Sequence, residues 1–331
     1  MKSYLGVDGG GTKTRFRLID EQGRILASHL EGSAYYLEVG LERAREMLAR
    51  GIAETLRLGG LDERALTYAF IGLPAYGEDH TLIEVLDALP AHGLPNRRYR
   101  CGNDMVCGWA GALAGADGIN VVCGTGSIAY GEYRGRAARA GGWGELFSDE
   151  GSSYWLAREG LRLFSRMSDG RAVRGPLYEQ VRRHFKLGQD LDLCAAIYGQ
   201  DAAHRSQLAQ LSQLVTAAAA DGDRAAQDLI EQAAEELADL VQAVHVRLEV
   251  PADASLPVTY SGGMFRLGER LTGPLRKKLE RRNGHLVLTA PRFSPDIGAA
   301  LQAARLHGSP LGAETLNDLE ANVARIEAAP G

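Results

Sequence analysis

The sequence predicts an α/β fold built as two domains. Strand-like apolar segments alternate with helix-period segments, and two glycine-rich loops recur in the same local setting. The length of 331 residues also exceeds the size of about 100–200 residues that is usual for one domain. Glycine supplies 41 of the 331 residues, about 12% against about 7% in ordinary proteins. Because glycine raises the entropic cost of folding, this excess needs a structural reason.

The first glycine run joins two predicted strands. Residues 4–8 form an apolar segment that ends at Asp8, and residues 14–20 alternate between apolar and polar in the manner of a half-buried strand. After a turn, residues 25–29 are expected to form a third strand. The run between the first two strands consists of Gly9, Gly10, Gly11, Thr12 and Lys13. The glycines therefore connect antiparallel strands and do not lead into a helix.

The second run repeats this pattern. Residues 118–123 predict a strand, which is followed by a short loop and a further strand that reaches Tyr133. The loop consists of Gly124, Thr125, Gly126 and Ser127. Aligning Val7 with Val122 gives an offset of 122 − 7 = 115 residues, which also aligns the glycines of the two loops. A third strand, at residues 258–260, runs into Gly262 and Gly263.

Several interpretations of these loops compete. A Walker A loop requires Lys where Thr12 stands, so that interpretation fails. Residues 124–129 match the letters of a dinucleotide fingerprint, but a strand is expected to follow where that motif opens a helix. Two alternatives remain: hairpin loops whose backbone N–H groups approach phosphate, or tight hairpins with glycine at positive φ. Recurrence in both halves favours the phosphate loops.

Two aspartates at predicted strand ends are candidates for chemistry. Asp104 lies between a strand at residues 98–101 and a helix at residues 105–113. It is either a helix N-cap or a general base for phosphoryl transfer, and its helix-end position predicts a lowered pKa. Asp8 either serves a turn or holds Mg²⁺ beside phosphates. Lys13 is either a solvated charge or a phosphate contact.

A longer segment offers candidates for recognition of a sugar. It contains Gly141, Gly142, Trp143 and Gly144, followed by Asp149, Glu150, Gly151 and Ser152. Asp149 is either a helix cap or an acceptor for sugar hydroxyls. Trp143 is either a core residue or a flat surface for a sugar face, and Trp155 is expected in the core.

Together, the run from Asp8 to Thr14, the loop at residues 124–127 and this later segment resemble the N-acetylglucosamine kinase / BadF-BadG-BcrA-BcrD ATPase family of the sugar kinase–Hsp70–actin superfamily. The resemblance extends from Tyr4 to about Leu306. It implies two ribonuclease-H-like (actin-like ATPase) domains, with the active site in the interdomain cleft. The expected domains are residues 1–117 and residues 118–331, the second carrying helical insertions. The last helix, at residues 315–329, is expected to pack on either domain.

The resemblance also implies roles for individual residues, with ATP and Mg²⁺ as cofactors. Asp104 would be the catalytic base and Asp8 the metal ligand. Phosphate contacts would come from Gly9, Gly10, Gly11, Thr12, Lys13, Gly124, Thr125, Gly126 and Ser127. The sugar would contact Asp104, Thr125, Gly142, Trp143 and Asp149, and the nucleoside would contact Gly262 and Gly263. The family often has Asn after a Ser-x pair, whereas here Ser33-Ala34 precedes Tyr35, which is expected to line the pocket and leaves the preferred sugar open.

Composition excludes several other classes. The formal charge of 37 − 42 = −5 argues against nucleic acid or anionic lipid as the main partner. No stretch approaches the roughly 18 apolar residues of a membrane span, and no signal peptide is recognised, so a cytoplasmic protein is expected. The cysteines, expected to be buried free thiols, are Cys101, Cys107, Cys123 and Cys194. The helix expected at residues 225–248 offers a face for a homodimer.

The leading functional hypothesis is an ATP-dependent kinase that transfers phosphate to the 6-hydroxyl of N-acetylglucosamine. One alternative is a kinase for glucosamine or a muramic-type sugar. A second is a BadF-type ATPase that activates a partner enzyme through a shared iron–sulfur cluster, for which the four cysteines lack suitable spacing. A third is a sugar or nucleotide sensor without turnover, which the aspartates Asp8, Asp104 and Asp149 disfavour.

Overall fold

The structure is a computed structural model that describes residues 1–199 and 205–328. The chain divides into two compact units. The first unit combines Met1–Asp117 with the chain from Ala290 onward, and the second is Gly118–Thr289. The first division falls where the sequence predicts the domain boundary. The expected second domain continued to residue 331, whereas the chain returns to the first unit after Thr289.

The first unit contains a five-stranded sheet of order β3-β2-β1-β4-β5. Its strands are β1 (Ser3–Asp8), β2 (Thr14–Asp20), β3 (Ile25–Glu31), β4 (Tyr68–Leu73) and β5 (Tyr99–Asn103). β1 pairs antiparallel with β2, which confirms that the first glycine run joins antiparallel strands. β1, β4 and β5 are parallel, so their carboxyl ends lie at one edge of the sheet.

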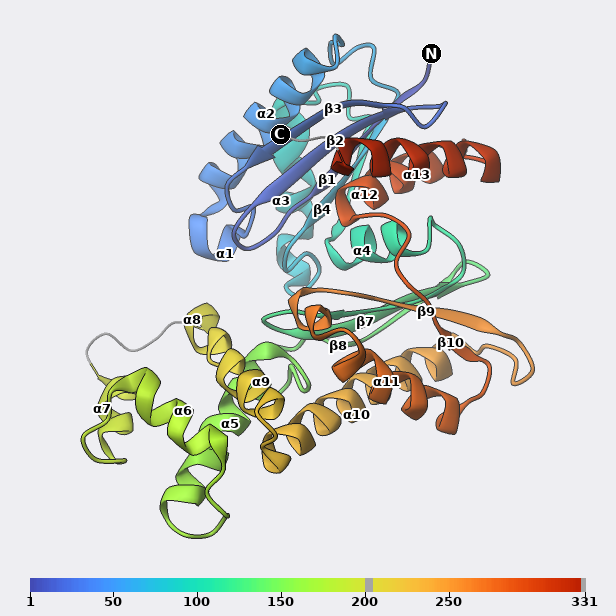
Figure 1. The fold of residues 1–331 in the computed structure, drawn as a ribbon. Helices are drawn as coiled ribbons and strands as arrows, with labels where there is room; N and C mark the ends of the chain where they lie inside the picture. The colour runs from blue at the N-terminus through green and yellow to red at the C-terminus, as the bar shows by residue number, and fades with distance from the viewer. Residues whose placement is uncertain (200–204, 329–331) are drawn as a thin grey trace. The chain divides into compact units, whose positions relative to one another are not determined.

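Helices cover both faces of this sheet (Figure 1). They are α1 (Tyr36–Val39), α2 (Leu41–Leu58), α3 (Ile83–Ala88), α4 (Met105–Ala112), α12 (Pro295–Leu306) and α13 (Ala313–Ala328). Leu5 and Val7 of β1 pack in the core that includes α2, whereas Tyr4 packs in the core that includes α12. This alternation is the period of two expected of a strand buried on both faces.

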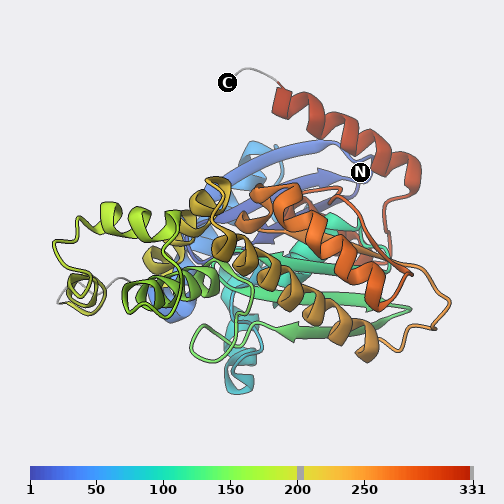
Figure 2. The ribbon, with the colours of Figure 1, turned by 60° about the horizontal axis from the view of Figure 1, so that its bottom comes forward.

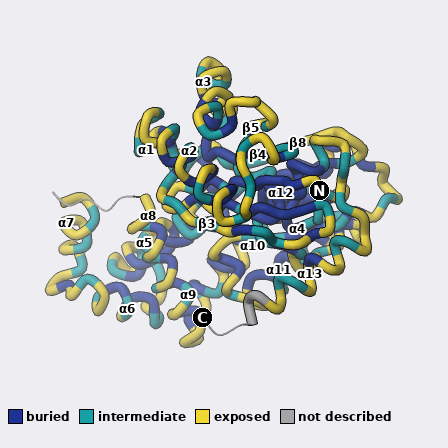
Figure 3. Tube along the Cα trace, turned by 90° about the horizontal axis from the view of Figure 1, so that it is seen from above, coloured by how far each residue is buried: buried dark blue, intermediate teal, exposed yellow. Residues whose placement is uncertain are grey.

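Close packing against β1 explains why α12 returns to the first unit. A Cβ on Gly6 would lie 2.2 Å from the backbone nitrogen of Ala300, so glycine in the strand lets the helix backbone approach the sheet. Figure 3 shows α12 buried along its length. α13 places Leu319 in the same core, so the last helix packs on the first unit. Ala329, the last residue of the predicted helix, lies outside the described residues.

The second unit repeats the same sheet connectivity in the order β10-β9-β6-β7-β8. Its strands are β6 (Gly118–Cys123), β7 (Ser127–Tyr133), β8 (Arg136–Gly141), β9 (Leu256–Ser261) and β10 (Leu286–Leu288). β6 pairs antiparallel with β7 and parallel with β9, as β1 does with β2 and β4. The first residues of β1 and β6 differ by 118 − 3 = 115, the offset of the glycine loops. β8 has no counterpart among the predicted strands.

The helices of the second unit form a layer on its sheet and a helical extension (Figure 2). They are α5 (Ser153–Ser168), α6 (Pro176–Phe185), α7 (Asp192–Tyr198), α8 (Arg205–Gln210), α9 (Ser212–Ala220), α10 (Arg224–Arg247) and α11 (Glu269–Arg282). Most apolar side chains of α10, such as Leu237 and Val241, are buried in the core of this unit, and Val246 is exposed. The apolar side of this helix, on which the expectation of a dimer face rested, therefore packs within its own unit.

The structure also tests the expectation for the cysteines. All four cysteines lie in the described residues and are free thiols, and three of them are buried. Cys194 is exposed on α7, so the expectation that all four are buried is wrong for this residue. α7 contributes no buried residue to the core, which explains that exposure. Among the described residues, no helix is both long and apolar enough to cross a membrane.

Candidate functional site

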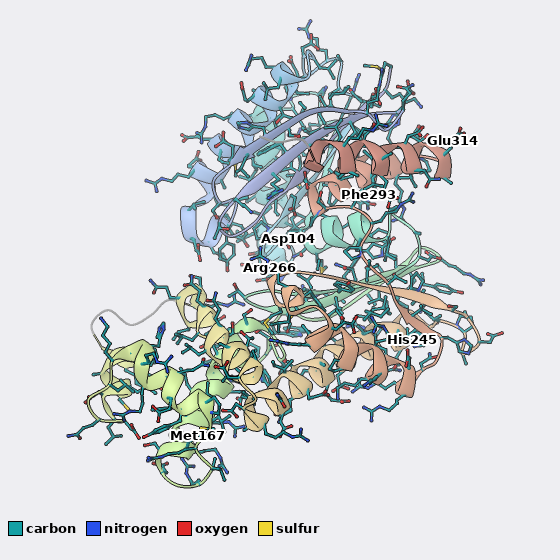
Figure 4. All side chains as sticks on the ribbon, in the orientation of Figure 1. Asp104, Met167, His245, Arg266, Phe293 and Glu314 are labelled. Atoms are coloured by element: carbon teal, nitrogen blue, oxygen red, sulfur yellow. The ribbon has the colours of Figure 1, made fainter. Side chains whose placement is uncertain are left out.

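Asp8 and Asp104 meet at the carboxyl edge of the first sheet. Asp8 ends β1, and Asp104 lies at the start of α4, directly after β5 (Figure 4). Gly72 at the end of β4 lies between them: a Cβ there would be 2.3 Å from the Cys107 sulfur and 3.3 Å from the Asp104 Cα. The Asp104 backbone N–H donates to the Leu73 carbonyl at 3.2 Å. The convergence follows from parallel strands, whose carboxyl ends form the usual binding edge of an α/β sheet.

Burial, not the helix end, dominates the ionisation of Asp104. The pKa of this carboxyl is raised to about 6, chiefly by burial and to a smaller extent by the nearby Glu78 carboxylate. The Met105 backbone N–H acts in the opposite direction but is weaker. The predicted lowering of the Asp104 pKa is therefore wrong, because loss of solvent outweighs the helix terminus. Asp104 occupies the N-cap position of α4, as one alternative predicted, but its side chain makes no capping hydrogen bond.

Asp8 lies in a strongly acidic environment. Burial raises its pKa well above the ordinary value, and the carboxylates of Asp104 and Asp296 raise it further. Arg15 and Lys13 oppose this shift without cancelling it. A carboxylate that is partly removed from water beside other carboxylates is stabilised by a bound cation.

The first glycine loop is packed at its base and exposed at its tip. Gly9 is buried, its N–H donates to the Gly72 carbonyl at 2.9 Å, and a Cβ would lie 2.5 Å from that oxygen. The Gly10 carbonyl accepts from the Ala34 N–H at 3.2 Å, which joins the loop that carries Tyr35 to the phosphate-loop candidate. The exposed tip consists of Gly11, Thr12 and Lys13.

The second loop rests on the start of α5. The carbonyls of Gly124 and Thr125 accept from the N–H groups of Ser153 at 2.9 Å and Tyr154 at 3.3 Å. Thr125 is exposed. Ser127 is buried, and its hydroxyl donates to the Glu150 carbonyl at 2.6 Å. The Ser127 hydroxyl therefore holds the loop against the segment that contains Glu150, within the same unit.

Positive φ does not explain the glycines of either loop. Among the described residues, the glycines with positive φ do not include Gly9, Gly10, Gly11, Gly124 or Gly126. The tight-hairpin alternative, which required left-handed glycine, is therefore wrong for both loops. Close approach explains Gly9 and Gly126, whereas a Cβ at Gly11 or Gly124 would meet no described atom within 4 Å. Space around Gly11 and Gly124 is what a loop that admits a ligand to its backbone requires.

Asp149 is a buried carboxylate held in an unusual backbone conformation. Its side chain is 2% exposed and its φ is +62°, a region that costs free energy for residues other than glycine. Oδ1 accepts from the Ser127 N–H at 3.2 Å, and Oδ2 pairs with the Arg205 guanidinium. The cap of α5 is Ser152, which accepts from the Trp155 N–H at 3.1 Å. The cap alternative for Asp149 is therefore wrong.

The segment before Asp149 presents an aromatic surface to solvent. Trp143 is 67% exposed, and the Arg139 guanidinium lies 5.6 Å from its ring centroid. The core alternative for Trp143 is therefore wrong, while Trp155 is buried in the core as predicted. Gly142 donates its N–H to the Ser127 carbonyl at 2.9 Å, which holds this segment beside the second glycine loop.

The predicted nucleoside loop lies beside the same strand end. Gly262 has a φ of +103°, and a Cβ there would lie 2.3 Å from the Cys123 carbonyl oxygen, so glycine is required. A Cβ at Gly263 would meet no described atom within 4 Å, so this residue borders open space. Cys123 directly precedes the second glycine loop, so the second unit brings these two predicted ligand contacts together.

Sequence reasoning missed two arginines, one in each unit, that pair with buried aspartates. Arg205 lies 56 residues from Asp149, and Arg17 lies 279 residues from its partner Asp296. Neither stands in a motif. A lone arginine in a helix or strand resembles any solvated charge, so no local signal distinguishes these two.

Paired glycine loops with aspartates, at the ends of two sheets of the same connectivity, define a duplicated α/β protein. The chain belongs to the BadF/BadG/BcrA/BcrD ATPase family, whose family model matches residues 5–303. The resemblance predicted from the motifs is thereby confirmed.

Individual relatives carry more specific names. The chain is 28% identical over 309 residues to an N-acetyl-D-glucosamine kinase of Dictyostelium discoideum, covering 91% of this chain and 97% of that protein. It is 28% identical to an N-acetylmuramic acid/N-acetylglucosamine kinase of Clostridium acetobutylicum, covering 92% and 98%. A Chromobacterium violaceum structure, provisionally named N-acetylglucosamine kinase, matches with a TM-score of 0.70 and 30% identity over 91% of this chain and 98% of that one.

Proposed function

We propose that this protein is an ATP-dependent amino-sugar kinase that phosphorylates the 6-hydroxyl of N-acetylglucosamine. The observation that carries the proposal is the convergence of Asp8 and Asp104 at the carboxyl edge of β1, β4 and β5, beside a glycine loop. Membership of an ATPase family and the names of the relatives support the same activity.

Asp104 is the proposed general base. Its pKa of about 6 leaves it mostly ionised at neutral pH, yet close enough to neutrality to accept the proton of a sugar hydroxyl. Phosphoryl transfer relies mainly on positioning and charge stabilisation, so a base that aligns the hydroxyl is sufficient. Because the Asp104 side chain makes no capping hydrogen bond to α4, its carboxylate is available for this role.

Asp8 fits a site for Mg²⁺. Magnesium usually keeps several waters and takes one or two protein carboxylates together with substrate phosphates. Among the described residues there is no cluster of three or more metal-ligating side chains, and such a cluster is not needed for this mode of binding. The raised pKa of Asp8 is that of a carboxylate whose charge is not compensated by its neighbours. When bound, Mg²⁺ would neutralise the phosphate oxygens.

The glycine loops supply the proposed phosphate contacts. The open Gly11 and the exposed Thr12 and Lys13 form the first set, and the open Gly124 with the exposed Thr125 forms the second. Gly126 and Ser127 are proposed to shape the second loop as well as to line it, because Ser127 donates to Asp149 and to the Glu150 carbonyl. Gly262 and Gly263 are proposed to let the backbone pass beside the nucleoside.

The acceptor sugar is proposed to contact Asp149, Trp143, Gly142 and Tyr35, in addition to Asp104 and Thr125. The exposed Trp143 ring suits packing against the apolar face of a sugar. Asp149 supplies carboxylate oxygens that accept hydrogen bonds from hydroxyl groups.

The test is a coupled assay of ADP release with N-acetylglucosamine, N-acetylmuramic acid, glucosamine and glucose. The proposal expects sugar-stimulated turnover that is highest with N-acetylglucosamine. Asp104→Ala should lower kcat by about 10²-fold or more and leave the KM for ATP unchanged. Absence of sugar-stimulated turnover, or full turnover in Asp104→Ala, would contradict the proposal.

A further inference from the structure

Arg205 connects Asp149, the carboxylate predicted to bind the sugar, to a helix that lies outside the sequence motifs. Its Nη2 pairs with Oδ2 of Asp149, and its Nε lies 3.0 Å from Oε2 of Glu145. Arg205 opens α8, which packs on α5, the helix that follows Asp149. The Arg205 side chain is 39% exposed, whereas the Asp149 side chain is 2% exposed. The arginine therefore reaches from the surface to a buried carboxylate.

We propose that Arg205 is a positioning residue for the acceptor sugar, which holds the Asp149 carboxylate ionised and oriented to accept hydrogen bonds from sugar hydroxyls. This inference rests on the proposed function. It assigns a role to a residue that lies outside every motif of the chain.

The hydrogen bonds of Asp149 leave acceptor positions of its carboxylate unused. The two oxygens of a carboxylate offer about four acceptor positions in total. The Ser127 N–H occupies one position on Oδ1, and Arg205 occupies one on Oδ2. Because these donors come from β7 and α8, they fix the plane of the carboxylate from two elements. Each oxygen keeps one further position for a hydroxyl.

Gly126 allows this arrangement to form. A Cβ at residue 126 would lie 2.8 Å from Asp149 Oδ2, 2.9 Å from Oδ1 and 2.8 Å from Arg205 Nη2. The ion pair therefore lies directly against the second glycine loop. This places the orientation of Asp149 next to the proposed phosphate contacts, where the acceptor hydroxyl must be aligned.

The charged groups around Asp149 also indicate a role for Arg205. Burial raises the pKa of Asp149, and Glu145 raises it further, while the Ser127 N–H and Arg205 lower it. The charged and titratable groups that face Asp149 are Arg205, Glu145 and the buried thiol of Cys123. Without Arg205, a buried carboxylate beside Glu145 would gain a proton more readily and lose acceptor capacity.

The experiment compares Arg205→Met with Arg205→Lys, and uses Arg171→Met as the matched control. Arg171 forms an exposed pair with Asp169 at 2.5 Å in the same unit. For each protein, kcat and the KM values for N-acetylglucosamine and ATP are measured between about pH 6 and pH 9, together with Tm.

In Arg205→Met, the KM for N-acetylglucosamine should rise about tenfold or more at the acidic end, because an acceptor for sugar hydroxyls is lost. The ratio to wild type should shrink as pH rises, since Asp149 then ionises without help. Arg205→Lys, which keeps the charge, should restore most of the affinity. The KM for ATP and the Arg171→Met control should match wild type, whereas Tm should fall in Arg205→Met because the buried Asp149 loses its partner, and should recover in Arg205→Lys.

Two results would overturn the proposal while the proposed function stands. One is an active wild type whose KM for the sugar is unchanged in Arg205→Met. The other is a rise in the KM for the sugar that is independent of pH and is accompanied by an equal rise in the KM for ATP. The second pattern is that of a purely structural residue. A wild type that shows no turnover with any sugar would instead overturn the proposed function itself, and this proposal with it.

Discussion

Arg17 of β2 forms a buried ion pair with Asp296 of α12, with both Nε and Nη2 at 2.7 Å from Oδ2. Asp296 is 1% exposed, and its other oxygen, Oδ1, has no hydrogen-bond partner among the described residues. The pair connects residues 279 positions apart in the sequence. It joins α12 to the sheet whose carboxyl edge holds Asp8, and Asp296 contributes to the raised pKa of Asp8.

Arg17→Met should therefore destabilise the first unit strongly. Removing one partner leaves an uncompensated buried charge, which typically costs about 3–5 kcal/mol of unfolding free energy. Urea unfolding measures the loss. Arg57→Met is the control, because Arg57 pairs with Glu54 on the exposed surface of α2 and should leave stability unchanged. Equal losses of unfolding free energy in the two variants would show that burial of Asp296 does not make its ion pair with Arg17 more important for stability.

The pH dependence of turnover should report Asp104. A general base acts only when ionised, so kcat/KM should fall as pH decreases through about 6. A pH–rate profile with the sugar at low concentration measures this limb. In Asp104→Asn the residual activity should lack it. A wild-type profile that stays flat down to pH 5 would argue against Asp104 as the base.

The same carboxylate should lower stability at neutral pH. The folded-state pKa of Asp104, about 6, exceeds the value of 3.8 for a free carboxyl, so the folded state binds more protons. Stability therefore falls as pH rises from about 4 to about 6. A shift of about two pKa units corresponds to roughly 3 kcal/mol at most.

Asp104→Asn should accordingly raise Tm at pH 7 and have little effect at pH 4. Thermal unfolding at the two pH values tests this difference, with the exposed Asp253→Asn as the control. A lower Tm for Asp104→Asn at pH 7 would mean that the carboxylate stabilises the fold, contrary to its burial.

The two glycines of the proposed nucleoside loop should respond differently to alanine. Gly262→Ala should lower Tm, because its φ of +103° and the Cys123 carbonyl 2.3 Å from a Cβ leave no room for a side chain. Gly263→Ala should fold normally, since no described atom lies within 4 Å of a Cβ there. If Gly263 passes beside the nucleoside, the KM for ATP of the Gly263→Ala variant should nevertheless rise. A wild-type KM for ATP in Gly263→Ala would remove this residue from the site.

Thiol labelling should distinguish the four cysteines. A thiol reagent added to the native protein should modify Cys194 rapidly, because it is the exposed cysteine of the described chain. The other three should react only after unfolding, since burial raises the pKa of each thiol and excludes the reagent. Cys194→Ser should abolish the fast reaction. Fast labelling that persists in this variant would contradict the burial of the others.

Local patterns were sufficient for the elements that carry the motifs. Alternating apolar residues and glycine runs predicted β1, β2, β6 and β7, and the offset of 115 residues anticipated two sheets of one connectivity. Asp8, Asp104 and Asp149 were recognisable because each stands at a strand or loop end in a short motif. Backbone preference and side-chain period act over a few residues, so a single sequence displays them.

Tertiary structure decided what depends on distant partners. The pairing of Arg205 with Asp149, the return of α12 to the first unit and the raised pKa of Asp104 have no local signature. Each arises because packing removes particular groups from water and brings together residues that are far apart in the chain. Desolvation and charge pairing depend on that packing, so they set the chemistry of side chains whose positions the sequence had already marked.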